Sequence, residues 1–334
     1  MQKHILITGG AGYIGSTLTG YLLNHQFKVT VVDNLSFGGE SLLAYWNHPH
    51  FSFINADLTQ PQALKRLFEN SKYDYIVHLA AIVGDPACAQ QPELARKVNG
   101  EASVNLFELA RKNKVERFVF ASTCSNYGKM ADRNKLIDEN SPLAPVSLYA
   151  ELKVQFEKYM LQDSKKTDGF SPTALRFATV YGPSPRMRFD LTVNEFTREL
   201  VLGRELEVFG EQFWRPYCHV YDFSRAIHRV LSVEQKKVAY NVFNVGDTQE
   251  NYQKQMIVNE IKKFIPDAKV KYVQKNEDPR DYKVSFAKIN NELEFKISQR
   301  VPDGIKQIKY LIEQKLILNP DDPKYSNIQQ EVCV

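Results

Sequence analysis

The sequence is poor in the features that mark several classes of protein. It has 4 cysteines in 334 residues, at positions 88, 124, 218 and 333, and no two of them form a C-x-x-C pair. Such scattered thiols argue against a disulfide framework or a zinc site and favour a reducing compartment, so we expect a cytoplasmic protein. The sequence contains no uncharged apolar run long enough to span a bilayer. The first residues lead straight into an expected strand and do not have the pattern of a signal peptide.

The chain also lacks a strong excess of charge of one sign. Lys and Arg number 43 and Asp and Glu number 39, which gives a net charge of +4. This balance gives no reason to expect nucleic acid or a membrane surface as a partner. Apolar residues make up 43% of the chain, as in soluble globular proteins, and the length suits one large or two closely packed domains.

Short apolar runs alternate with helical patterns through the first half of the chain. We expect strands at His4–Thr8, Lys28–Asp33, Phe51–Asn55, Tyr75–Ala80, Arg117–Ser122 and Thr173–Tyr181. We expect helices at Ser16–Asn24, Pro61–Asn70, Pro92–Lys112 and Leu148–Ser164. Apolar runs without alternation are typical of strands that are buried on both faces. The alternation of strands and helices therefore predicts an α/β fold with a parallel, doubly wound sheet.

The pattern changes after the Gly-Pro-Ser-Pro breaker at 182–185. Further helices are expected at Leu191–Leu202, Asp222–Ser232, Gln253–Phe264 and Asp303–Gln314, and strands at Ala239–Val245 and Lys269–Tyr272. We predict a nucleotide-binding domain over 1–181, to which a strand near 239–246 returns. Residues 182–318 would form most of a smaller α+β substrate-binding lobe. Residues 319–334 are a polar tail that we expect to be poorly ordered.

A glycine-rich turn follows the first expected strand and precedes the first expected helix. Residues 8–15 read T-G-G-A-G-Y-I-G, which spaces Gly9, Gly12 and Gly15 three residues apart. Glycine permits positive φ and lets the backbone approach a pyrophosphate, which the free N–H groups of the following helix bind. Asp33 ends the second strand roughly 20 residues on, where a carboxylate accepts the adenosine ribose hydroxyls. Because that carboxylate would repel a 2′-phosphate, we expect NAD rather than NADP.

Other residues border the same expected crevice. Asp57 follows the third strand, where it either flanks the adenine or caps the next helix. The small residues after the fourth strand would let backbone pass close to the cofactor, whereas His78 is expected to be a packed strand residue. Asn99 lies in an expected helix, where its side chain would brace a loop. Besides the three glycines and Asp33, the expected cofactor contacts are Tyr13, Ile14, Asn34, Asp57, Leu58, Ala80, Ala81, Asn99, Ser122, Tyr149, Lys153 and Phe177.

Tyr149 and Lys153 are spaced i and i+4, which places both on one face of an expected helix. An ammonium group beside a phenol lowers the pKa of the tyrosine, so that tyrosinate can serve as a base. The stretch S-T-C-S at 122–125 ends the fifth strand about 25 residues upstream. Ligands bind outside the carboxyl ends of strands in an open α/β sheet, so these hydroxyls would meet Tyr149 across a substrate.

Eight motifs along the chain carry a family resemblance. They are TGGAGYIG (8–15), VVDNLS (31–36), HLAA (78–81), FASTCSNYG (120–128), YAELK (149–153), RFATVYGP (176–183), WRPYCHVYD (214–222) and PRD (279–281). With them, about residues 3–315 resemble the extended short-chain dehydrogenase/reductase family of NAD-dependent nucleotide-sugar epimerases and dehydratases, including UDP-glucose 4-epimerase-like enzymes. The resemblance implies a Rossmann sheet with a smaller sugar-nucleotide lobe, and a homodimer formed through helices 92–112 and 148–164.

The resemblance implies a role for each catalytic candidate. Tyr149 would take the proton from the C4 hydroxyl of the sugar as hydride passes to the nicotinamide, and Thr123 would hydrogen-bond that oxygen. Lys153 would hold the nicotinamide ribose and tune Tyr149. Arg215 and Arg280 would bind the diphosphate of the sugar nucleotide, which suits the planar fork of a guanidinium.

Asn194 and Arg188 complete the expected substrate contacts. Family members often place an asparagine at the position of Asn194 on the same phosphates. Arg186 and Arg188 lie in a loop that replaces the usual sugar-facing segment, where they either bind a charged sugar or phosphate or are solvated. His219, close to Arg215 in the sequence, is expected to be structural.

Cys124 departs from the family patterns and leaves the product open. Dehydratases usually carry two carboxylates where this chain has Cys124 and Ser125, which counts against dehydration. The thiol would either exchange a proton beside a sugar carbonyl, as cysteines of 3,5-epimerases do, or be a small buried residue. We therefore expect NAD-dependent oxidoreduction at C4 of a nucleotide-linked sugar, with a 4-epimerase as the first hypothesis.

Three alternatives stay open at this point. A nucleotide-sugar 4-dehydrogenase or 4-ketoreductase would share the first chemical step. A 4,6-dehydratase or 3,5-epimerase would make Cys124 a catalytic residue. A non-catalytic NAD(P)-binding regulator belongs to another class, in which the Tyr149 and Lys153 pair is commonly lost.

Overall fold

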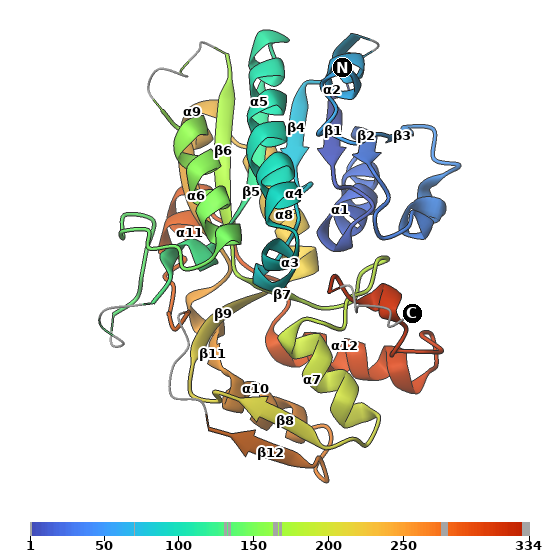
Figure 1. Ribbon diagram of the computed structural model, residues 1–334, viewed down its shortest axis with the longest axis vertical. Coiled ribbons are helices and arrows are strands. Elements are labelled where there is room, and N and C mark those ends of the chain that lie inside the picture. The colour runs from blue at the N-terminus through green and yellow to red at the C-terminus, as the bar shows by residue number, and fades with distance from the viewer. Residues whose placement is uncertain are drawn as a thin grey trace.

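The computed structural model of the protein describes residues 2–69, 71–129, 132, 135–162, 166, 169–274 and 280–328. Within these residues the largest element is a seven-stranded sheet, in which all neighbouring strands run parallel. Across the sheet, the strands are β10 (Asn241–Val245), β6 (Ser171–Phe177), β5 (Arg117–Thr123), β4 (Tyr75–His78), β1 (His4–Thr8), β2 (Lys28–Asp33) and β3 (Phe51–Asn55). The strand order reverses between β1 and β4, which is where doubly wound folds bind ligands (Figure 1).

Helices cover both faces of this main sheet, and each face has its own apolar core. The helices on one face are α1 (Tyr13–Asn24), α8 (Val220–Ser232) and α11 (Ala287–Leu293). Those on the other face are α2 (Pro61–Glu69), α5 (Ser103–Lys112) and α6 (Leu148–Met160). Every residue of β1, β4 and β6 is buried, which explains the unbroken apolar runs of the sequence. The predicted α/β Rossmann fold is confirmed.

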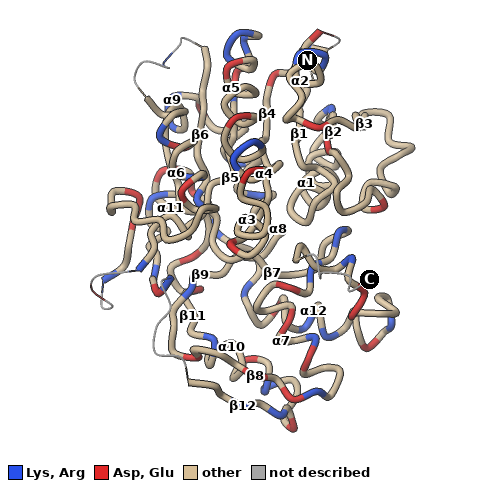
Figure 2. The backbone as a smooth tube through the Cα atoms, viewed as in Figure 1, with Lys and Arg blue, Asp and Glu red and all other residues tan. Residues whose placement is uncertain are grey.

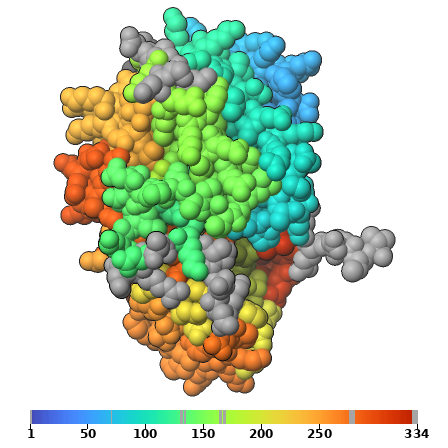
Figure 3. Space-filling view, turned by 60° about the vertical axis from the view of Figure 1, so that its left-hand side comes forward, coloured from blue at the N-terminus to red at the C-terminus, as the bar shows by residue number. Residues whose placement is uncertain are grey.

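A smaller α+β lobe lies beyond the carboxyl ends of the strands (Figures 1 and 3). Its elements are β7 (Thr179–Tyr181), α7 (Thr192–Val201), β8 (Leu206–Phe209), β9 (Trp214–His219), β11 (Asn251–Gln253), α10 (Lys254–Lys262), β12 (Val270–Val273) and α12 (Val301–Glu313). Strands β7, β9 and β11 form one small sheet, β8 pairs with β12, and the lobe has a core of its own. Figure 2 shows charges of both signs mixed over the main body and the lobe.

Short helices fill the connections. They are η1 (Glu40–Tyr45), α3 (Asp85–Gln90), α4 (Pro92–Ala95), η2 (Arg96–Ala102), η3 (Cys124–Tyr127), α9 (Gln235–Val238), η5 (Thr248–Glu250) and η6 (Pro323–Tyr325). The helix expected at 92–112 is therefore α4, a π-helical segment η2 and α5 in succession. Among the described helices, none is long and apolar enough to cross a membrane.

Several elements differ from the expectations. The strand expected at 173–181 is two strands, because the chain leaves the main sheet after Phe177 and β7 joins the lobe. Strands β8 and β9 and helix α11 were missed, β9 because it contains a proline and an arginine that made its segment look like turns. The strand expected at 239–245 does return to the main sheet as β10, paired with β6. Helices α8 and α11 pack against the main sheet, so the lobe is smaller than the range 182–318.

The expectation of a poorly ordered tail is wrong for residues 319–328. The backbone carbonyl of Tyr325 accepts a hydrogen bond from Phe189 N at 2.8 Å, and Asn327 N donates to Asp190 Oδ2 at 3.0 Å. Asp321 pairs with Arg204 at 2.5 Å. Polar residues suggested a solvated tail, but here they find partners on the lobe. Residues 329–334, together with Asn70, Ser164 and Pro279 of the predicted elements and motifs, lie outside the described residues.

Candidate active site

The glycine turn joins β1 to α1 as expected. Gly9 has a φ of +71°, and a Cβ there would lie 2.7 Å from Ala80 N. A Cβ on Gly15 would lie 2.2 Å from Gly9 O, so both positions are closed to larger residues by neighbouring backbone. Gly12 differs, because its Cβ would meet only Gly9 O, at 3.3 Å, and would otherwise fill the space in front of the helix. In the described chain no side chain caps α1, so its first N–H groups can bind an anion.

Asp33 fastens the end of β2 to this turn. Its Oδ2 accepts a hydrogen bond from Ala11 N at 3.0 Å, and its Oδ1 accepts one from Leu35 N at 2.9 Å. A carboxylate has about four acceptor positions, so capacity for ribose hydroxyls remains. Burial raises the pKa of Asp33, while backbone N–H groups oppose that rise. The open space at Gly12, the N-terminus of α1 and the acceptors of Asp33 together fit a dinucleotide.

The residues after β4 complete the lower rim of this crevice. Ala80 lies against Gly9, and its N–H donates to Thr8 Oγ1 at 3.2 Å. His78 is buried between Thr8 Oγ1 at 2.7 Å and Ser103 Oγ at 2.9 Å, and burial lowers its pKa to about 3. It is a packed strand residue, as expected.

Three expected cofactor contacts have other tasks in the structure. Both ends of the Asn99 amide bond Ile82, at 2.8 Å to N and 2.9 Å to O, so Asn99 braces the loop after β4 instead of reaching a ligand. The Oδ1 atom of Asp57 accepts hydrogen bonds from Thr59 N and Thr59 Oγ1, which occupy it within the turn before α2. The hydroxyl of Ser122 donates to Glu157 Oε2 at 2.7 Å in the buried interior. Internal hydrogen bonds use the polar atoms that sequence reasoning had assigned to the cofactor.

Tyr149 and Lys153 lie on one face of α6, whose N-terminus is capped by Ser147. Lys153 Nζ donates to the carbonyl of Ala121 at 2.8 Å and lies 5.8 Å from the centre of the Tyr149 ring. Burial lowers the pKa of Lys153 to about 7. Burial also raises the pKa of Tyr149 above its ordinary value, with Cys88 and Asp85 adding to the rise and Arg188 opposing it. The protein without ligands therefore does not show the lowering of the Tyr149 pKa that was expected from Lys153.

Thr123 and Cys124 are neighbours with different surroundings. Thr123 ends β5, and its Oγ1 accepts from Ser125 N at 3.1 Å, which leaves its O–H free to donate to a ligand. Cys124 is 1% exposed, and its Sγ donates to Arg176 O at 3.2 Å. Burial raises the pKa of this thiol strongly. These surroundings favour the alternative in which Cys124 is a small buried residue, because the first turn of η3 directs the thiol to Arg176 O.

A buried ion pair lies next to the end of β5. Arg176 of β6 and Glu157 of α6 are paired by hydrogen bonds, with side chains 5% and 3% exposed. Arg176 also donates to Tyr127 OH at 2.9 Å, and Glu157 accepts from Ser122. This network ties β5, β6 and α6 together, so it fixes the position of the helix that carries Tyr149.

The two arginines expected at a diphosphate come from the lobe side. Arg215 lies on β9, donates to Trp214 O at 2.7 Å and stacks over Tyr282 with 5.3 Å between the guanidinium carbon and the ring centre. Tyr282 OH is in turn 3.5 Å from Ser125 Oγ, beside Thr123. These contacts connect the lobe to the end of β5. Arg215 and Thr123 therefore belong to one site.

Arg280 reaches the same region through a carboxylate that sequence reasoning missed. Its Nη1 lies 2.9 Å from Asp85 Oδ2, and Asp85 Oδ1 accepts from Ser147 Oγ at 2.7 Å. Asp85 thus joins Arg280 to the cap of the Tyr149 helix. The only sequence signal was its place at the start of a short helix, before a proline. Tyr282 was also missed, although it follows the PRD motif directly.

Asn194 is not placed to contact a substrate. It is fully buried, its Oδ1 accepts from Gly182 N at 2.9 Å, and its Nδ2 donates to Arg188 O at 2.8 Å. The residue braces the loop before α7. Arg188 makes two hydrogen bonds to Asp190, at 2.9 and 2.7 Å, yet it is near enough to lower the pKa of Tyr149.

Two further residues have structural places. His219 Nδ1 accepts a hydrogen bond from Tyr221 N at 3.1 Å and caps α8, which agrees with the structural role expected for this residue. Phe177 stacks on Phe223 with ring centres 4.1 Å apart, so its side chain faces the core of the main body.

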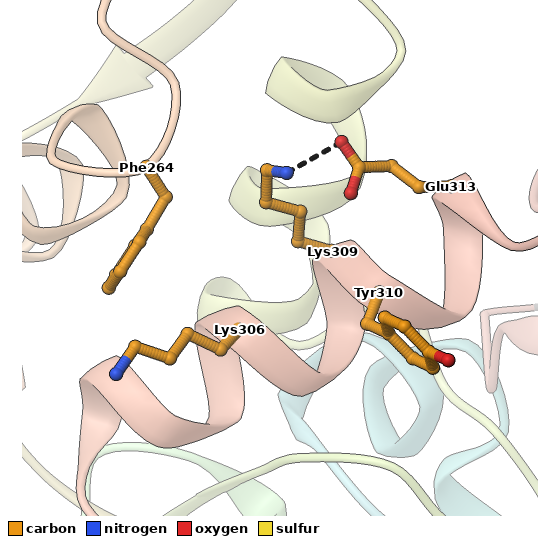
Figure 4. Close-up of a pocket in the computed structure, with 5 residues that line it drawn as sticks. All are labelled: Phe264, Lys306, Lys309, Tyr310 and Glu313. Carbon is orange, nitrogen blue, oxygen red and sulfur yellow. Dashed lines mark hydrogen bonds and ion pairs between the residues drawn. The ribbon is translucent and has the colours of Figure 1, made fainter.

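A hollow on the lobe surface is separate from these residues. Phe264, Lys306, Lys309, Tyr310 and Glu313 line it, and the last four lie on α12 (Figure 4). Lys309 and Glu313 form an ion pair at 2.6 Å along the helix. No expected catalytic or cofactor residue lines this hollow.

Comparison with known proteins decides the family. Residues 5–246, well over half of the chain, match the NAD dependent epimerase/dehydratase family. The chain belongs to this family. The family is NAD dependent, so the predicted cofactor, NAD, and the prediction of an enzyme are confirmed.

Similar proteins act on nucleotide sugars by name. A protein of Oryza sativa subsp. japonica named "Probable UDP-arabinose 4-epimerase 1" is 31% identical over 320 residues, covering 87% of this chain and 74% of its own. The UDP-glucose 4-epimerase of Thermus thermophilus, solved with NAD, is 25% identical with a TM-score of 0.80, covering 93% of this chain and 99% of its own. The UDP-glucose 4-epimerase of Thermotoga maritima, solved with UDP-glucose, is 26% identical with a TM-score of 0.82, covering 94% and 99%.

Proposed function

We propose that this protein is a nucleotide-sugar 4-epimerase that interconverts the C4 epimers of a UDP-sugar. The observation that carries the proposal is the contact of Lys153, which lies beside Tyr149 on α6, with the carbonyl of Ala121 on β5, the strand that Thr123 ends. This group lies at the edge of the sheet where the glycine turn receives NAD. The similar proteins named above are 4-epimerases of UDP-sugars, which supports the same substrate class here.

The chemistry assigns one task to each residue. Tyr149 takes the proton of the C4 hydroxyl and later returns it, while Thr123 donates a hydrogen bond to the same oxygen. Lys153, 5.8 Å from the Tyr149 ring centre, holds the nicotinamide ribose with its remaining donors. When bound, NAD would supply the acceptor for the C4 hydride and the source for its return. Turning the 4-keto sugar between the two transfers inverts C4.

Tyr149 must lose its proton more easily than burial alone allows. The charge of Arg188 opposes the rise in the pKa of Tyr149, although Asp190 neutralises Arg188 in part. We therefore assign to Arg188, besides the substrate contact expected from the sequence, a share in tuning Tyr149. Arg215 and Arg280 bind the diphosphate of the sugar nucleotide in this proposal, and Gly12, Tyr13, Ile14 and Asp33 bind the dinucleotide.

The burial of Cys124 favours epimerisation over dehydration and over exchange at C3 or C5. Both of those reactions need an acid–base group beside the catalytic threonine, and the thiol there is directed to Arg176 O. A 4-dehydrogenase or 4-ketoreductase stays the second candidate, because it shares the first step.

The test is C4 inversion. Purified protein is incubated with UDP-glucose, UDP-arabinose, UDP-glucuronate and UDP-N-acetylglucosamine, and the products are followed by NMR. We expect one pair of epimers to reach equilibrium with no net change in added NAD. Absence of inversion for every sugar would reject the proposal, and net NADH formation would establish the dehydrogenase instead.

We further propose a division of the chain and an assembly. Residues 1–181 with 239–246 form most of the NAD-binding domain and most of 182–318 forms the sugar-nucleotide lobe; the separate cores support two units, with α8 and α11 on the main sheet and Tyr181 in the lobe. The assembly is a homodimer through helices 92–112 and 148–160, which lie next to each other on one face. The cytoplasm stays the proposed location, because the three cysteines within the described residues are free thiols.

A further inference from the structure

Arg186 is a buried arginine that forms no ion pair among the described residues, and Asp190 acts on its charge only from beyond ion-pair distance. It lies between β7 and α7 and is 7% exposed. Among the described residues its guanidinium makes one hydrogen bond, from Nη2 to Ser326 O at 3.3 Å, and its buried Nε has no partner. Burying an unpaired charge is strongly unfavourable unless a ligand supplies the opposite charge.

Other buried arginines of this protein are paired. Arg188, two residues away, has Asp190, and Arg176 has Glu157. Burial lowers the pKa of Arg186 to about 10, and the neighbouring charge of Arg188 contributes to that fall. The fold therefore places two positive groups near one carboxylate, Asp190, which pairs with Arg188 and only partly opposes the fall in the pKa of Arg186. An anion from outside would complete the arrangement.

The position of Arg186 indicates which anion this is. Its guanidinium stacks over Phe37 with 4.6 Å between its carbon and the ring centre, and Phe37 follows Asp33 by four residues. The backbone before it is fastened to α1, because Ser184 Oγ donates to Tyr13 O at 2.6 Å and Arg186 N donates to Ser16 Oγ at 3.4 Å. The side chain thus lies between the first turn of α1 and the segment after β2, the two borders of the dinucleotide crevice.

We propose that Arg186 binds the pyrophosphate of NAD, opposite the N–H groups at the start of α1. A guanidinium offers up to five donors in a planar fork, and Arg186 has more donors than its one bond to Ser326 uses, so charge-assisted bonds to phosphate oxygens are left to it. The contact through Ser326 gives the C-terminal segment a part in the cofactor site, since it holds Arg186 from the other side. This assignment needs NAD binding only, and it stands whatever sugar the enzyme converts.

The test measures affinity rather than turnover. Protein freed of nucleotide is titrated with NAD, ADP-ribose and adenosine by displacement of NADH fluorescence. For R186M we expect a loss of affinity of about 10- to 100-fold for NAD and ADP-ribose, since charge-assisted hydrogen bonds are among the stronger ones. The affinity of R186M for adenosine should stay within about twofold of the wild type. The NAD affinity of R186K should lie between those of the wild type and R186M. Unchanged NAD affinity, or an equal loss for adenosine, would overturn the proposal.

A second measurement separates binding from structure. Without nucleotide, R186M should melt at or above the temperature of the wild type, because the substitution removes an uncompensated buried charge. A lower melting temperature together with unchanged NAD affinity would show a structural residue. A loss confined to NADP would point to a 2′-phosphate and would also contradict the proposal.

Arg198 offers a matched control. It stacks on Phe189 at 5.5 Å and donates to Pro320 O at 3.4 Å, but its partner Glu199 supplies a carboxylate. R198M therefore removes the same kind of packing against the C-terminal segment from an arginine that is already neutralised. It should leave NAD affinity unchanged.

Discussion

Two regions of the molecule face each other across the site. The floor consists of Thr123 at the end of β5 and Tyr149 and Lys153 on α6, while the wall consists of Arg215 and Arg280 from the lobe side. Lys153 of the floor bonds the buried strand β5 through Ala121 O, and the Arg176–Glu157 pair, at 5% and 3% exposure, ties the floor's helix α6 to β6. Arg280 of the wall forms an ion pair with Asp85, and the two side chains are 40% and 26% exposed.

The difference separates chemistry from recognition. Buried, hydrogen-bonded charges have little freedom and keep the geometry of proton transfer constant. Partly exposed ion pairs are screened by water and salt, so they hold a side chain in place only weakly. We infer that substitutions in the floor change kcat or stability, whereas those in the wall change KM. Each prediction below can break this division.

The largest effect is expected for Tyr149→Phe. Loss of the phenol O–H removes the proton acceptor, so kcat should fall by about 10²- to 10⁴-fold. Affinity for NAD, measured by NADH fluorescence, should stay within about threefold, because the ring is retained. Activity within about tenfold of the wild type would show that another group moves the proton.

Breaking the buried pair of the floor should cost stability. Glu157→Gln leaves Arg176 without its counter-charge, so the free energy of unfolding should fall by about 3–5 kcal/mol. Urea unfolding followed by circular dichroism measures the change. Glu207→Gln is the control, because Glu207 pairs with Lys271 at the surface and should cost less than about 1 kcal/mol.

The depressed pKa of Lys153 makes stability depend on pH in the protein without nucleotide. Because its pKa is about 7 when folded and 10.5 ordinarily, the unfolded chain binds more protons between these values. The free energy of unfolding should therefore rise with pH over this range. Over this pH range the free energy of unfolding of Lys153→Met should rise less than that of the wild type, by more than about 1.4 kcal/mol, the equivalent of one pKa unit. Equal slopes for both proteins would contradict the depressed pKa.

A smaller effect is expected in the wall. Asp85→Asn removes the charge that orients Arg280, so KM for the sugar nucleotide should rise by about three- to fivefold at low salt, with kcat nearly unchanged. The difference should shrink as salt is added. Asp322→Asn, at an exposed pair with Lys324, is the control. A fall in kcat without a change in KM would place Asp85 in the floor.

The smallest effect on activity is expected for Cys124→Ala. Because the thiol faces the carbonyl of Arg176, kcat should stay within about twofold, and stability should fall by about 1 kcal/mol through the lost packing. The reaction in deuterated water should place no deuterium at C3 or C5 of the sugar. Deuterium there that disappears in the variant would restore a catalytic role for Cys124.

Local patterns predicted the floor better than the wall. Tyr149 and Lys153 share a helix, and Thr123 ends a strand, so spacing and strand order were enough to bring them together. Cys124, Asn194 and Asn99 were named as site candidates, yet their polar atoms bond other parts of the protein, because a motif does not say which way a side chain points. Asp85 and Arg280 are far apart in the sequence, and their pairing had no local pattern.

The sequence by itself determined the Rossmann fold, the NAD site and the family, because these depend on short-range features: glycine spacing, apolar periodicity and the i to i+4 pair. Only the tertiary structure decided which polar groups are left for ligands. Charge balance is a property of neighbours in space, so Arg188 and Arg186 look alike in the sequence, yet of the two only Arg188 forms an ion pair within the described residues. The same reason explains why Thr123 and Cys124 differ: although they are adjacent in the sequence, one presents a donor to the site and the other a thiol to the core.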